Sequence, residues 1–412
     1  MKALIAGGGI GGLTAALFLH RAGVDVEVYE RTDDIRELGV GINLLPHAVR
    51  ELSVLGLQPE LDAAGIRLGE LRYANRLGQV VWQEARGVDA GHDHPQISIH
   101  RGRLLGLIYG AVVERLGASA VRTGHRVLSV HQTDRQVEVE IQCRDGMRSI
   151  IEADLLIGAD GIHSTIRSQF YPDEGAPIWN GVMLWRGCTD WPTWRDGRTM
   201  MVAGGNFAKF VFYPIAKHPE RGDLHLTNWA VMAKTGEEGR SPPRPEDWSR
   251  PGVREEALSF VRNTFRLTGI DPAAIIMATP NVYEYPNCDR HPLARWSFGR
   301  VTLLGDAAHP MYPVGSNGAS QAILDASTLA ACLESTSPIQ AALEAYDAQR
   351  RPATAKIILA NRQGGPERVI DMVEARAPHG FSDIDAVATV EEREAIVRGY
   401  AKLSPVRGKT QR

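Results

Sequence analysis

The chain has 412 residues, a formal net charge of −3 at pH 7 and 43% hydrophobic residues, a length that accommodates two or three domains. The balanced charge, without a basic block, gives no electrostatic basis for binding nucleic acid or an anionic membrane, and neither partner is expected. The 4 cysteines have no paired spacing, so no zinc site or disulfide framework is predicted, and no apolar run reaches the roughly 18 residues of a membrane span. We therefore expect a cytoplasmic protein.

The first 30 residues predict a βαβ unit. Residues 3–6 form a short apolar run of the length of a buried parallel strand, and residues 13–21 repeat apolar side chains at helical spacing. Residues 24–29 then alternate between apolar and polar side chains, as a second strand does. Such units build parallel sheets that carry helices on their faces.

A glycine-rich turn joins the first strand to the helix. Its spacing fits G-x-G-x-x-G through Gly7, Gly9 and Gly12. Glycine permits the tight turn and lets the backbone approach a pyrophosphate, which the free N–H groups of the helix N-terminus can bind. Glu30 ends the second strand, where its carboxylate can accept a hydrogen bond from a ribose 2′-hydroxyl. The combination predicts a dinucleotide site, and a plain glycine-rich turn is the alternative.

Two arginines stand at the beginning of another predicted helix. Residues 96–99 predict the end of a strand and residues 104–116 an amphipathic helix, with Arg101 and Arg103 between them. Cations at a helix N-terminus oppose the helix dipole unless an anion offsets them. Either arginine is therefore a candidate phosphate contact, and a solvated pair is the alternative.

Two later segments repeat the pattern of a buried strand with an acid at its carboxyl end. Asp160 follows the apolar run at 155–157, and Asp306 follows the run at 301–304. In parallel sheets this edge is where ligands bind. Beyond Asp306, a Pro- and Gly-rich loop over 311–318 leads into a helix, an arrangement whose N–H groups suit a developing negative charge.

The middle of the chain predicts antiparallel strands. Residues 71–84 predict a hairpin, residues 127–153 three strands, and residues 179–230 four strands that are rich in aromatic side chains. The aromatic sheet can wall a pocket for an apolar ring, although core packing is the alternative for most of its rings. His92 and His94 lie on a polar loop without a further ligand motif, so no metal is predicted.

These strand-end sites together resemble those of the single-component FAD-dependent aromatic monooxygenases of the para-hydroxybenzoate hydroxylase group. The likeness extends to about Asn361 and is strongest to the branch that contains 5-methylphenazine-1-carboxylate 1-monooxygenases, with salicylate and 6-hydroxynicotinate hydroxylases nearby. The segments that carry it are LGVGIN at 38–43, SIHRG at 98–102, WRG at 185–187 and GSNGASQ at 315–321.

The resemblance implies an α/β fold with a Rossmann-like FAD-binding domain of the glutathione-reductase type, an inserted β-sheet substrate domain and a C-terminal helical region. The implied FAD-binding domain comprises residues 1–70, 97–176 and 291–362, and the substrate domain comprises residues 71–96 and 177–290. Residues 363–412 are expected to form a polar tail with a last short helix near 390–403 and no chemistry of its own.

The resemblance also implies a set of FAD contacts. The ADP half would lie against the glycine turn, Glu30 and Arg31, and Arg101 would reach the pyrophosphate. Asp160 would serve both FAD and the reductant, and Asp306 would bind the flavin's ribityl or ribose-side hydroxyls. The loop would approach the isoalloxazine edge. The implied cofactor-binding residues are Gly7, Gly9, Gly12, Glu30, Arg31, Arg101, Asp160, Asp306, Gly315, Asn317 and Gly318.

The implied reaction is hydroxylation of an N-heteroaromatic or carboxylated aromatic compound through a C4a-hydroperoxyflavin, with O₂ and NADH or NADPH. Pro313 would face the oxygen, and Tyr213 would orient or deprotonate a ring hydroxyl. Arg186 would meet a substrate carboxylate. The remaining pocket residues would be Trp185, Trp229 and Tyr312.

Other readings remain open from the sequence. One is an FAD-dependent dehydrogenase or reductase of a polycyclic or isoprenoid substrate, and another is a flavin-binding regulatory protein without turnover. The residues leave monomer and homodimer equally open.

Overall fold

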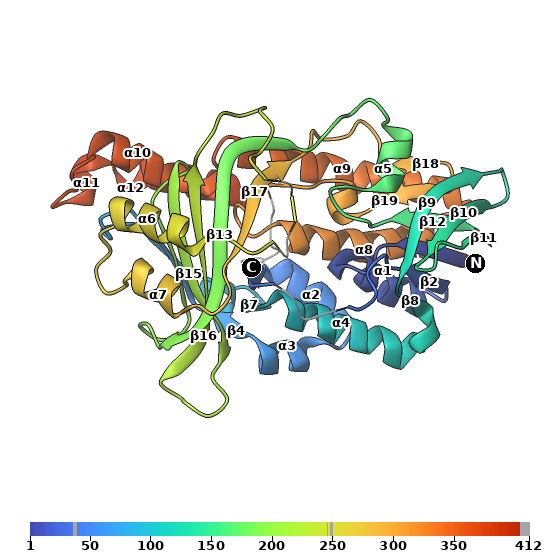
Figure 1. Ribbon diagram of the computed structural model, residues 1–412, viewed down its shortest axis with the longest axis horizontal. Coiled ribbons are helices and arrows are strands. Elements are labelled where there is room, and N and C mark those ends of the chain that lie inside the picture. Colours follow the sequence, from blue (N-terminus) through green and yellow to red (C-terminus); the bar gives the residue numbers. More distant parts are fainter. Residues whose placement is uncertain (36–38, 245, 248–249, 404–412) are drawn as a thin grey trace, which may run out of the picture.

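The computed structural model describes residues 1–35, 39–244, 246–247 and 250–403. Leu38, which opens one of the segments of the resemblance, and residues 404–412 lie outside the described residues. The described chain forms two large sheets and two small ones, with helices packed around them (Figure 1). The predicted α/β fold is therefore confirmed, with an aromatic-rich sheet beside a mainly parallel one.

A six-stranded sheet contains the first βαβ unit. Its strands are β1 (Lys2–Ala6), β2 (Asp25–Tyr29), β8 (Val121–Arg122), β12 (Leu155–Gly158), β18 (Ser297–Phe298) and β19 (Val301–Leu303). Their order is β18-β19-β12-β1-β2-β8, and β1 pairs in parallel with both β2 and β12. Because β19 is parallel to β12 as well, the carboxyl ends of these strands meet at one edge of the sheet.

Helices and the antiparallel segment 125–153 pack on this sheet, so its central strands β1, β12 and β19 are largely buried. The principal helices are α1 (Ile10–Arg21), α4 (Arg101–Leu116), α8 (Gly318–Ser335) and α9 (Ile339–Arg362). Ile5, Leu156 and Leu303 are fully buried. None of the helices in the described part of the chain combines the length and apolarity that a membrane crossing needs.

Two three-stranded sheets and several short helices flank the parallel sheet. The first small sheet contains β9 (His125–Gln132), β10 (Val137–Cys143) and β11 (Arg148–Ala153), as the alternating pattern predicted. The second contains β3 (Gly41–Leu44), β4 (Ile66–Leu68) and β7 (Gln96–His100). The short helices nearby are α2 (Pro46–Val54), α3 (Gln58–Ala64), α5 (Thr165–Phe170), η1 (Gly87–Ala90) and η2 (Ala118–Ala120).

The second large sheet has seven strands in the order β17-β13-β16-β15-β14-β5-β6. Its strands are β5 (Glu70–Ala74), β6 (Val80–Ala85), β13 (Ile178–Pro192), β14 (Thr199–Ala203), β15 (Ala208–Lys217), β16 (Leu224–Lys234) and β17 (Tyr283–Asp289). The hairpin of β5 and β6 joins this sheet through a parallel pairing of β5 with β14. Strands that are far apart in the sequence therefore form one continuous sheet.

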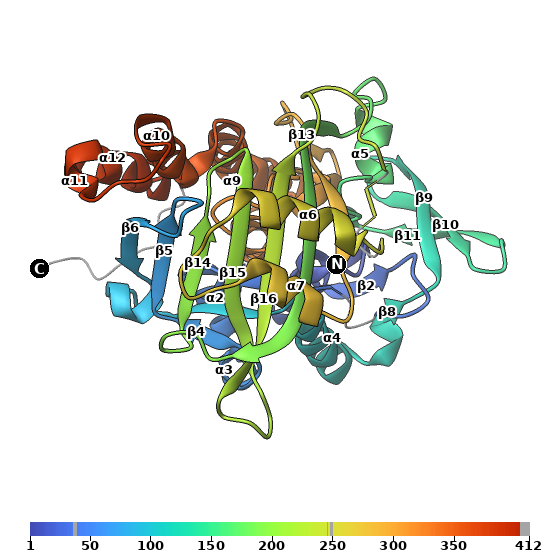
Figure 2. The same ribbon diagram turned by 60° about the vertical axis from the view of Figure 1, so that its left-hand side comes forward.

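The two faces of this sheet have different neighbours. Helices α6 (Arg254–Thr264) and α7 (Pro272–Ala278) cover what we call the outer face (Figure 2). The opposite face, which we call the inner face, contacts the small sheet of β3, β4 and β7. The Gly41 N–H donates to Asn228 Oδ1 at 2.7 Å, and Ser98 Oγ donates to the Pro214 carbonyl at 2.6 Å. The inner face is the one turned toward the parallel sheet.

The C-terminal segment packs on the rest of the protein, which the polar tail predicted from the sequence did not anticipate, whereas the short helix predicted near residues 390–403 is confirmed. It forms η4 (Gly365–Glu367), α10 (Arg368–Arg376), α11 (Ile384–Val387) and α12 (Val390–Ala401). Buried side chains including Val369, Val373 and Val397 pack with the inner-face residues Tyr213 and Ile215. These helices are short and mostly polar, so their few apolar contacts gave a weak pattern in the sequence.

Candidate active site

The glycine turn lies where β1 meets α1, and two of its glycines are required by space. Gly7 has a φ of +110°, and a Cβ there would lie 2.3 Å from the Ala159 carbonyl oxygen. A Cβ on Gly12 would lie 2.0 Å from the carbonyl oxygen of Gly7. Gly9 differs, because no heavy atom lies within 4 Å of a Cβ placed there. The turn therefore packs tightly against the protein on one side and faces open space on the other.

The helix that follows has no side-chain cap among the described residues. Gly9 is the N-cap residue of α1, which has neither a side-chain cap nor an acidic residue in its first turn. Free N–H groups and the positive end of the helix dipole therefore point toward the open space at Gly9. This is the environment that a pyrophosphate requires.

Glu30 stands beside this turn at the end of β2. Its carboxylate accepts hydrogen bonds from the Gly8 N–H at 2.7 Å, the Thr32 N–H at 2.8 Å and Thr32 Oγ1 at 3.0 Å. An ionised carboxylate has about four acceptor positions, so it is held rigidly and retains capacity for a ribose hydroxyl. Arg31, the next residue, is exposed, and its contact with FAD stays a prediction.

Asp160 is hydrogen-bonded to the residues that begin the next helix, α5. Its carboxylate accepts hydrogen bonds from Ser164 Oγ at 2.5 Å and from the Thr165 N–H at 2.7 Å, while Ser164 caps α5. Burial raises the pKa of Asp160, although these hydrogen bonds act in the opposite direction. A direct contact with FAD or the reductant stays a prediction, and the structure gives Asp160 a supporting role in the turn.

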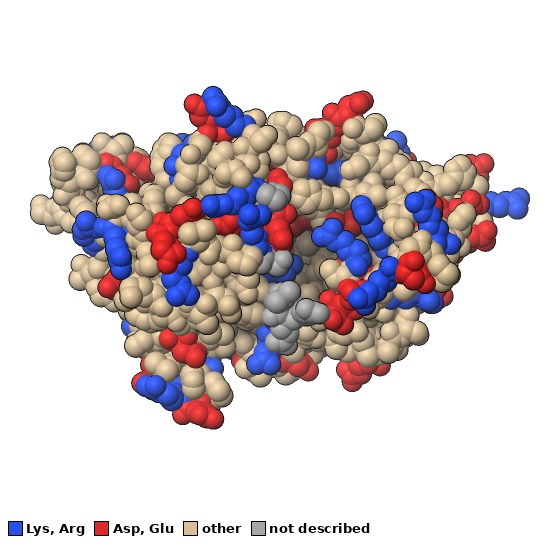
Figure 3. Space-filling model, viewed as in Figure 1, with Lys and Arg blue, Asp and Glu red and all other residues tan. Residues whose placement is uncertain are grey.

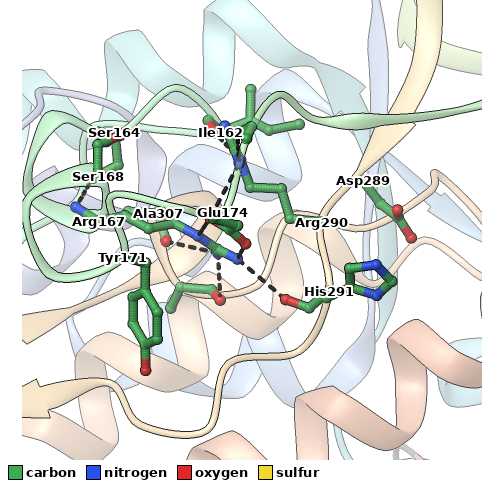
Figure 4. A network of polar contacts seen from close by, with 12 residues as sticks. Ile162, Ser164, Arg167, Ser168, Tyr171, Glu174, Asp289, Arg290, His291 and Ala307 are labelled. Carbon is green, nitrogen blue, oxygen red and sulfur yellow. Dashed lines mark hydrogen bonds and ion pairs between the residues drawn. The ribbon is translucent and has the colours of Figure 1, made fainter. Parts of the chain in front are cut away.

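A buried arginine ties this turn to the segment that carries Asp306. Arg167 is only 1% exposed, and its guanidinium donates to the carbonyl oxygens of Ala307 at 3.1 Å and Ala308 at 3.0 Å (Figure 4). It also forms an ion pair with Glu174, which Arg290 contacts from the other side at 3.1 Å. Sequence reasoning did not identify this network, because Glu174 and Arg290 lie in loops without a recognisable motif.

Asp306 presents an unpaired carboxylate to the cleft. It lies in the 3₁₀ turn η3 (Gly305–Ala307), and it is exposed although Gly305 and Ala307 are buried. No described residue donates a hydrogen bond to its carboxylate. Desolvation by the surrounding protein raises the pKa of Asp306, and the positive charges of His309 and Arg101 partly oppose this. Such a carboxylate is suited to accept hydrogen bonds from sugar-alcohol hydroxyls.

Arg101 supplies the complementary charge. Its backbone N–H donates to the Val40 carbonyl at 2.8 Å, whereas no described residue accepts a hydrogen bond from its guanidinium. Desolvation lowers the pKa of Arg101, and the negative charge of Asp306 partly restores it. Figure 3 shows a recess near the centre of one face, with Lys and Arg side chains gathered beside it. Cation, carboxylate and helix N-terminus match the pyrophosphate and ribityl portions of FAD, so the residues present fit this cofactor.

The loop at residues 312–318 leads into α8. Gly315 and Ser316 both have left-handed backbones, with φ of +63° and +60°. Asn317 is the N-cap residue of α8 and makes no side-chain cap, so the first N–H groups of that helix are free. A Cβ on Gly318 would meet nothing within 4 Å. The loop can therefore present N–H donors to the edge of an isoalloxazine ring, and Pro313 is exposed within it.

The inner face of the seven-stranded sheet carries two of the predicted substrate residues. Arg186 pairs in register with Ala230, which in turn lies opposite Val211 on the inner face. Burial lowers the pKa of Arg186 to about 9, with a further contribution from Arg101, so the two cations are close in space. Tyr213 is 6% exposed, and burial raises the pKa of its phenol well above the ordinary value.

The tryptophans predicted to shape the pocket lie on the other side. Trp185 follows the strand alternation and therefore points to the outer face, opposite to Arg186. Trp229 is fully buried there and donates from Nε1 to Thr279 Oγ1 at 2.7 Å. Both belong to the cluster under α6 and α7, so the pocket prediction is corrected for this pair. Tyr312 is buried in the loop at residues 312–318, and burial raises its pKa.

Asn228, Leu184 and Met232 occupy the inner-face positions that the tryptophans were expected to fill. The period-2 alternation of β13 and β16 could have identified them once Arg186 was assigned to the pocket. Within the described residues, no group of three or more His, Cys, Asp and Glu side chains is arranged to hold a metal ion.

Known proteins resemble this chain in sequence and in fold. A family model described as FAD binding domain matches residues 1–360. A phenazine 1,6-dicarboxylic acid hydroxylase of Lysobacter antibioticus is 43% identical over 364 residues, which cover 87% of this chain and 88% of the relative. A 3-hydroxybenzoate 6-hydroxylase of Polaromonas naphthalenivorans is 31% identical over 404 residues, covering 93% and 94%. The Klebsiella pneumoniae protein HpxO, solved with FAD and uric acid, superposes with a TM-score of 0.73 at 24% identity, covering 98% and 96%.

Proposed function

The chain belongs to the family of proteins with this FAD binding domain, and from that membership we propose that it hydroxylates a carboxylated N-heteroaromatic ring, of the phenazine-carboxylate type. It is an FAD-dependent aromatic monooxygenase, as are the relatives that match most of its length. The reaction consumes one O₂, one NAD(P)H and one proton, inserts one oxygen atom into a ring C–H bond, and releases NAD(P)⁺ and water.

The proposed substrate class rests on the position and burial of Arg186. Its guanidinium lies on the inner face, where burial lowers its pKa to about 9 and where Arg101 is near enough to act on it. A ring carboxylate is a planar group that arginine can bind through two parallel hydrogen bonds, and the low dielectric of a buried site strengthens the attraction between the two charges. The two named hydroxylases support this, since their names give phenazine 1,6-dicarboxylic acid and 3-hydroxybenzoate as substrates.

Bound FAD supplies the electron transfer from the nicotinamide and the activation of O₂. The protein itself binds the cofactor, orients the substrate and stabilises negative charge. Arg101 and the N-terminus of α1 bind the pyrophosphate, while Asp306 accepts from hydroxyls of the linking chain. Arg186 orients the substrate through its carboxylate. The N–H groups that begin α8 stabilise negative charge at the pyrimidine edge of the ring system.

Tyr213 acts as a hydrogen-bond donor in this arrangement. The raised pKa of its phenol keeps it protonated at neutral pH, so it orients a ring substituent and does not remove a proton from it. This narrows the sequence prediction, which left both roles open. Apolar inner-face side chains, Leu184 and Met232 among them, exclude water from the ring.

The purified FAD-loaded protein tests the proposal directly. We expect phenazine-1-carboxylate and phenazine-1,6-dicarboxylate to accelerate NAD(P)H oxidation, whereas unsubstituted phenazine does not. The product should gain one oxygen atom from ¹⁸O₂, measured by mass spectrometry. Reductant oxidation with oxidation of the substrate but no label would instead identify a dehydrogenase, and indifference to every aromatic acid would overturn the proposal.

A further inference from the structure

The last described helix, α12, reaches the loop that faces the flavin. A capping box between Thr389 and Glu392 fixes its beginning. Arg393 donates from Nη1 to the Val81 carbonyl of β6 at 2.9 Å, and Val397 is buried against the inner-face cluster. These contacts anchor the helix on the sheet and carry Tyr400, near its end, toward the loop.

The hydroxyl of Tyr400 joins three parts of the chain. It accepts a hydrogen bond from Asn317 Nδ2 at 2.9 Å. Its own proton has two acceptors within reach, Asn361 Oδ1 at 2.6 Å and the Val314 carbonyl at 3.2 Å. A phenol has a single proton, so the shorter contact with Asn361, at the end of α9, is the one that it satisfies. Burial raises the pKa of Tyr400, which keeps the hydroxyl protonated.

The ring of Tyr400 packs directly on the backbone of the loop. A Cβ on Gly315 would lie 2.5 Å from its Cε1 and 2.6 Å from its hydroxyl. The adjoining residue, Ser316, has a φ of +60°, which is strained for a residue with a side chain. Strained conformations of this kind persist only where surrounding contacts hold them. Tyr400 contacts the residues on either side of Ser316, namely Gly315 and Asn317.

Further hydrogen bonds lead from Asn317 through α8 and α9 to Gly305. Asn317 Oδ1 accepts from Gln321 Nε2 at 3.2 Å, and Gln321 Oε1 accepts from Arg350 at 2.7 Å. Arg350 is ion-paired with Asp325 at 2.7 Å, and Asp325 accepts from the Gly305 N–H at 3.1 Å. One hydrogen-bonded path therefore runs from Tyr400 to the turn that carries Asp306.

We propose that Tyr400 is a positioning residue, which holds the backbone of residues 314–318 in the orientation that presents its N–H groups to the flavin. The inference rests on the proposed function only through FAD binding and is independent of the substrate. It assigns the C-terminal segment a part in the cofactor site, although that segment contains no recognised nucleotide motif.

The sharpest variant is Tyr400→Phe, which keeps the ring on Gly315 and removes only the hydroxyl. The matched control is Tyr171→Phe, whose hydroxyl donates to the Arg295 carbonyl at 2.8 Å, away from the loop. We expect Tyr400→Phe to weaken FAD binding about five-fold, the equivalent of one neutral hydrogen bond. The visible absorption spectrum and midpoint potential of the bound flavin should shift, and the amides of residues 314–318 in the holoenzyme should exchange with deuterium faster. The control should leave all four readouts unchanged.

A purely structural role for Tyr400 would lower thermal stability without moving the spectrum or the potential of the bound flavin. That result would overturn the proposal, as would wild-type values of every readout in Tyr400→Phe. If this variant does not fold, Asn361→Leu removes the acceptor of the same hydroxyl and is expected to weaken FAD binding similarly. Because none of these readouts uses an aromatic substrate, a wrong substrate class and a wrong role for Tyr400 give different results.

Discussion

Arg186 and Trp185 are neighbours on β13, yet their side chains lie on opposite faces of the seven-stranded sheet. This single step along the strand separates the residue that we propose to bind the substrate from a residue of the outer core. The first two predictions test the two sides of that division.

Replacing Arg186 with methionine should impair the recognition of carboxylated substrates. Losing a charge-assisted pair costs about 1.5–3 kcal/mol, which is roughly a 10- to 100-fold rise in KM. Steady-state oxidation of NAD(P)H with an aromatic acid measures this change. Arg72→Met is the matched control, because Arg72 is ion-paired with Glu70 at 3.0 Å on the same sheet, and its KM should stay within two-fold, by the usual size of surface effects. Equal KM values in both variants would remove Arg186 from the pocket.

Replacing Trp229 with phenylalanine should affect stability and leave the KM unchanged. The variant loses the hydrogen bond to Thr279 Oγ1 and part of a fully buried ring, so the free energy of unfolding should fall by about 1–3 kcal/mol. Urea denaturation measures the loss. A large change of KM with unchanged stability would return Trp229 to the substrate pocket.

Tyr213→Phe should leave the pH dependence of kcat/KM unaltered in shape. Burial raises the pKa of the phenol well above its ordinary value, so it remains protonated across the accessible range and contributes no inflection. The variant should turn over more slowly, because an orienting donor is lost, while retaining FAD with wild-type affinity. Disappearance of an inflection from the pH profile would instead identify Tyr213 as a base.

Gly9 and Gly12 should respond differently to substitution by alanine. Gly9→Ala adds a methyl group to open space, in a backbone of φ −77° that alanine adopts readily, so the apoprotein should fold normally and bind FAD weakly. Gly12→Ala forces a methyl group to within 2.0 Å of the Gly7 carbonyl oxygen, so the apoprotein itself should be destabilised. Thermal denaturation and FAD titration separate these effects. Similar melting temperatures for the two apoproteins would contradict the assignment.

Asp325→Asn should destabilise the protein strongly, because it leaves His309 and Arg350 without a buried anion. Breaking a buried pair in this way costs about 3–5 kcal/mol. Burial alone would raise the pKa of Asp325, but His309 and Arg350 outweigh it and lower the pKa below the ordinary value. A depressed pKa contributes stability above the unfolded pKa of about 4, and that contribution is lost as the pH falls through the folded value.

Unfolding measured from pH 7 down to pH 3 should therefore show a smaller acid-dependent loss in Asp325→Asn than in the wild type. Asp62→Asn is the control, because Asp62 is partly exposed in its pair with Arg67. An equal acid dependence in both variants would show that Asp325 does not contribute this stability.

Local sequence signals identified the parallel sheet and singled out residues at its carboxyl edge. Gly7, Gly12 and Glu30 were selected because one short βαβ unit contains its strand, turn and acid together, and Asp306 because it follows a mostly apolar run. These features depend on neighbours in the sequence, which is why they could be predicted.

The remaining features depend on residues that are distant in the sequence. Trp229 was assigned to the wrong face, because alternation gives two faces without saying which one borders the ligand. Arg167 acts through carbonyl groups that are 140 and 141 residues away. Tyr400 has no motif at all, and its importance follows only from the way α12 docks.

That docking sets an order of events during biosynthesis. The Tyr400 hydroxyl reaches the Val314 carbonyl across 86 positions of sequence, so a ribosome has synthesised every strand of both large sheets well before this contact can form. The sheets can therefore assemble first, while the loop at residues 314–318 gains its contacts with Tyr400 only after α12 has emerged.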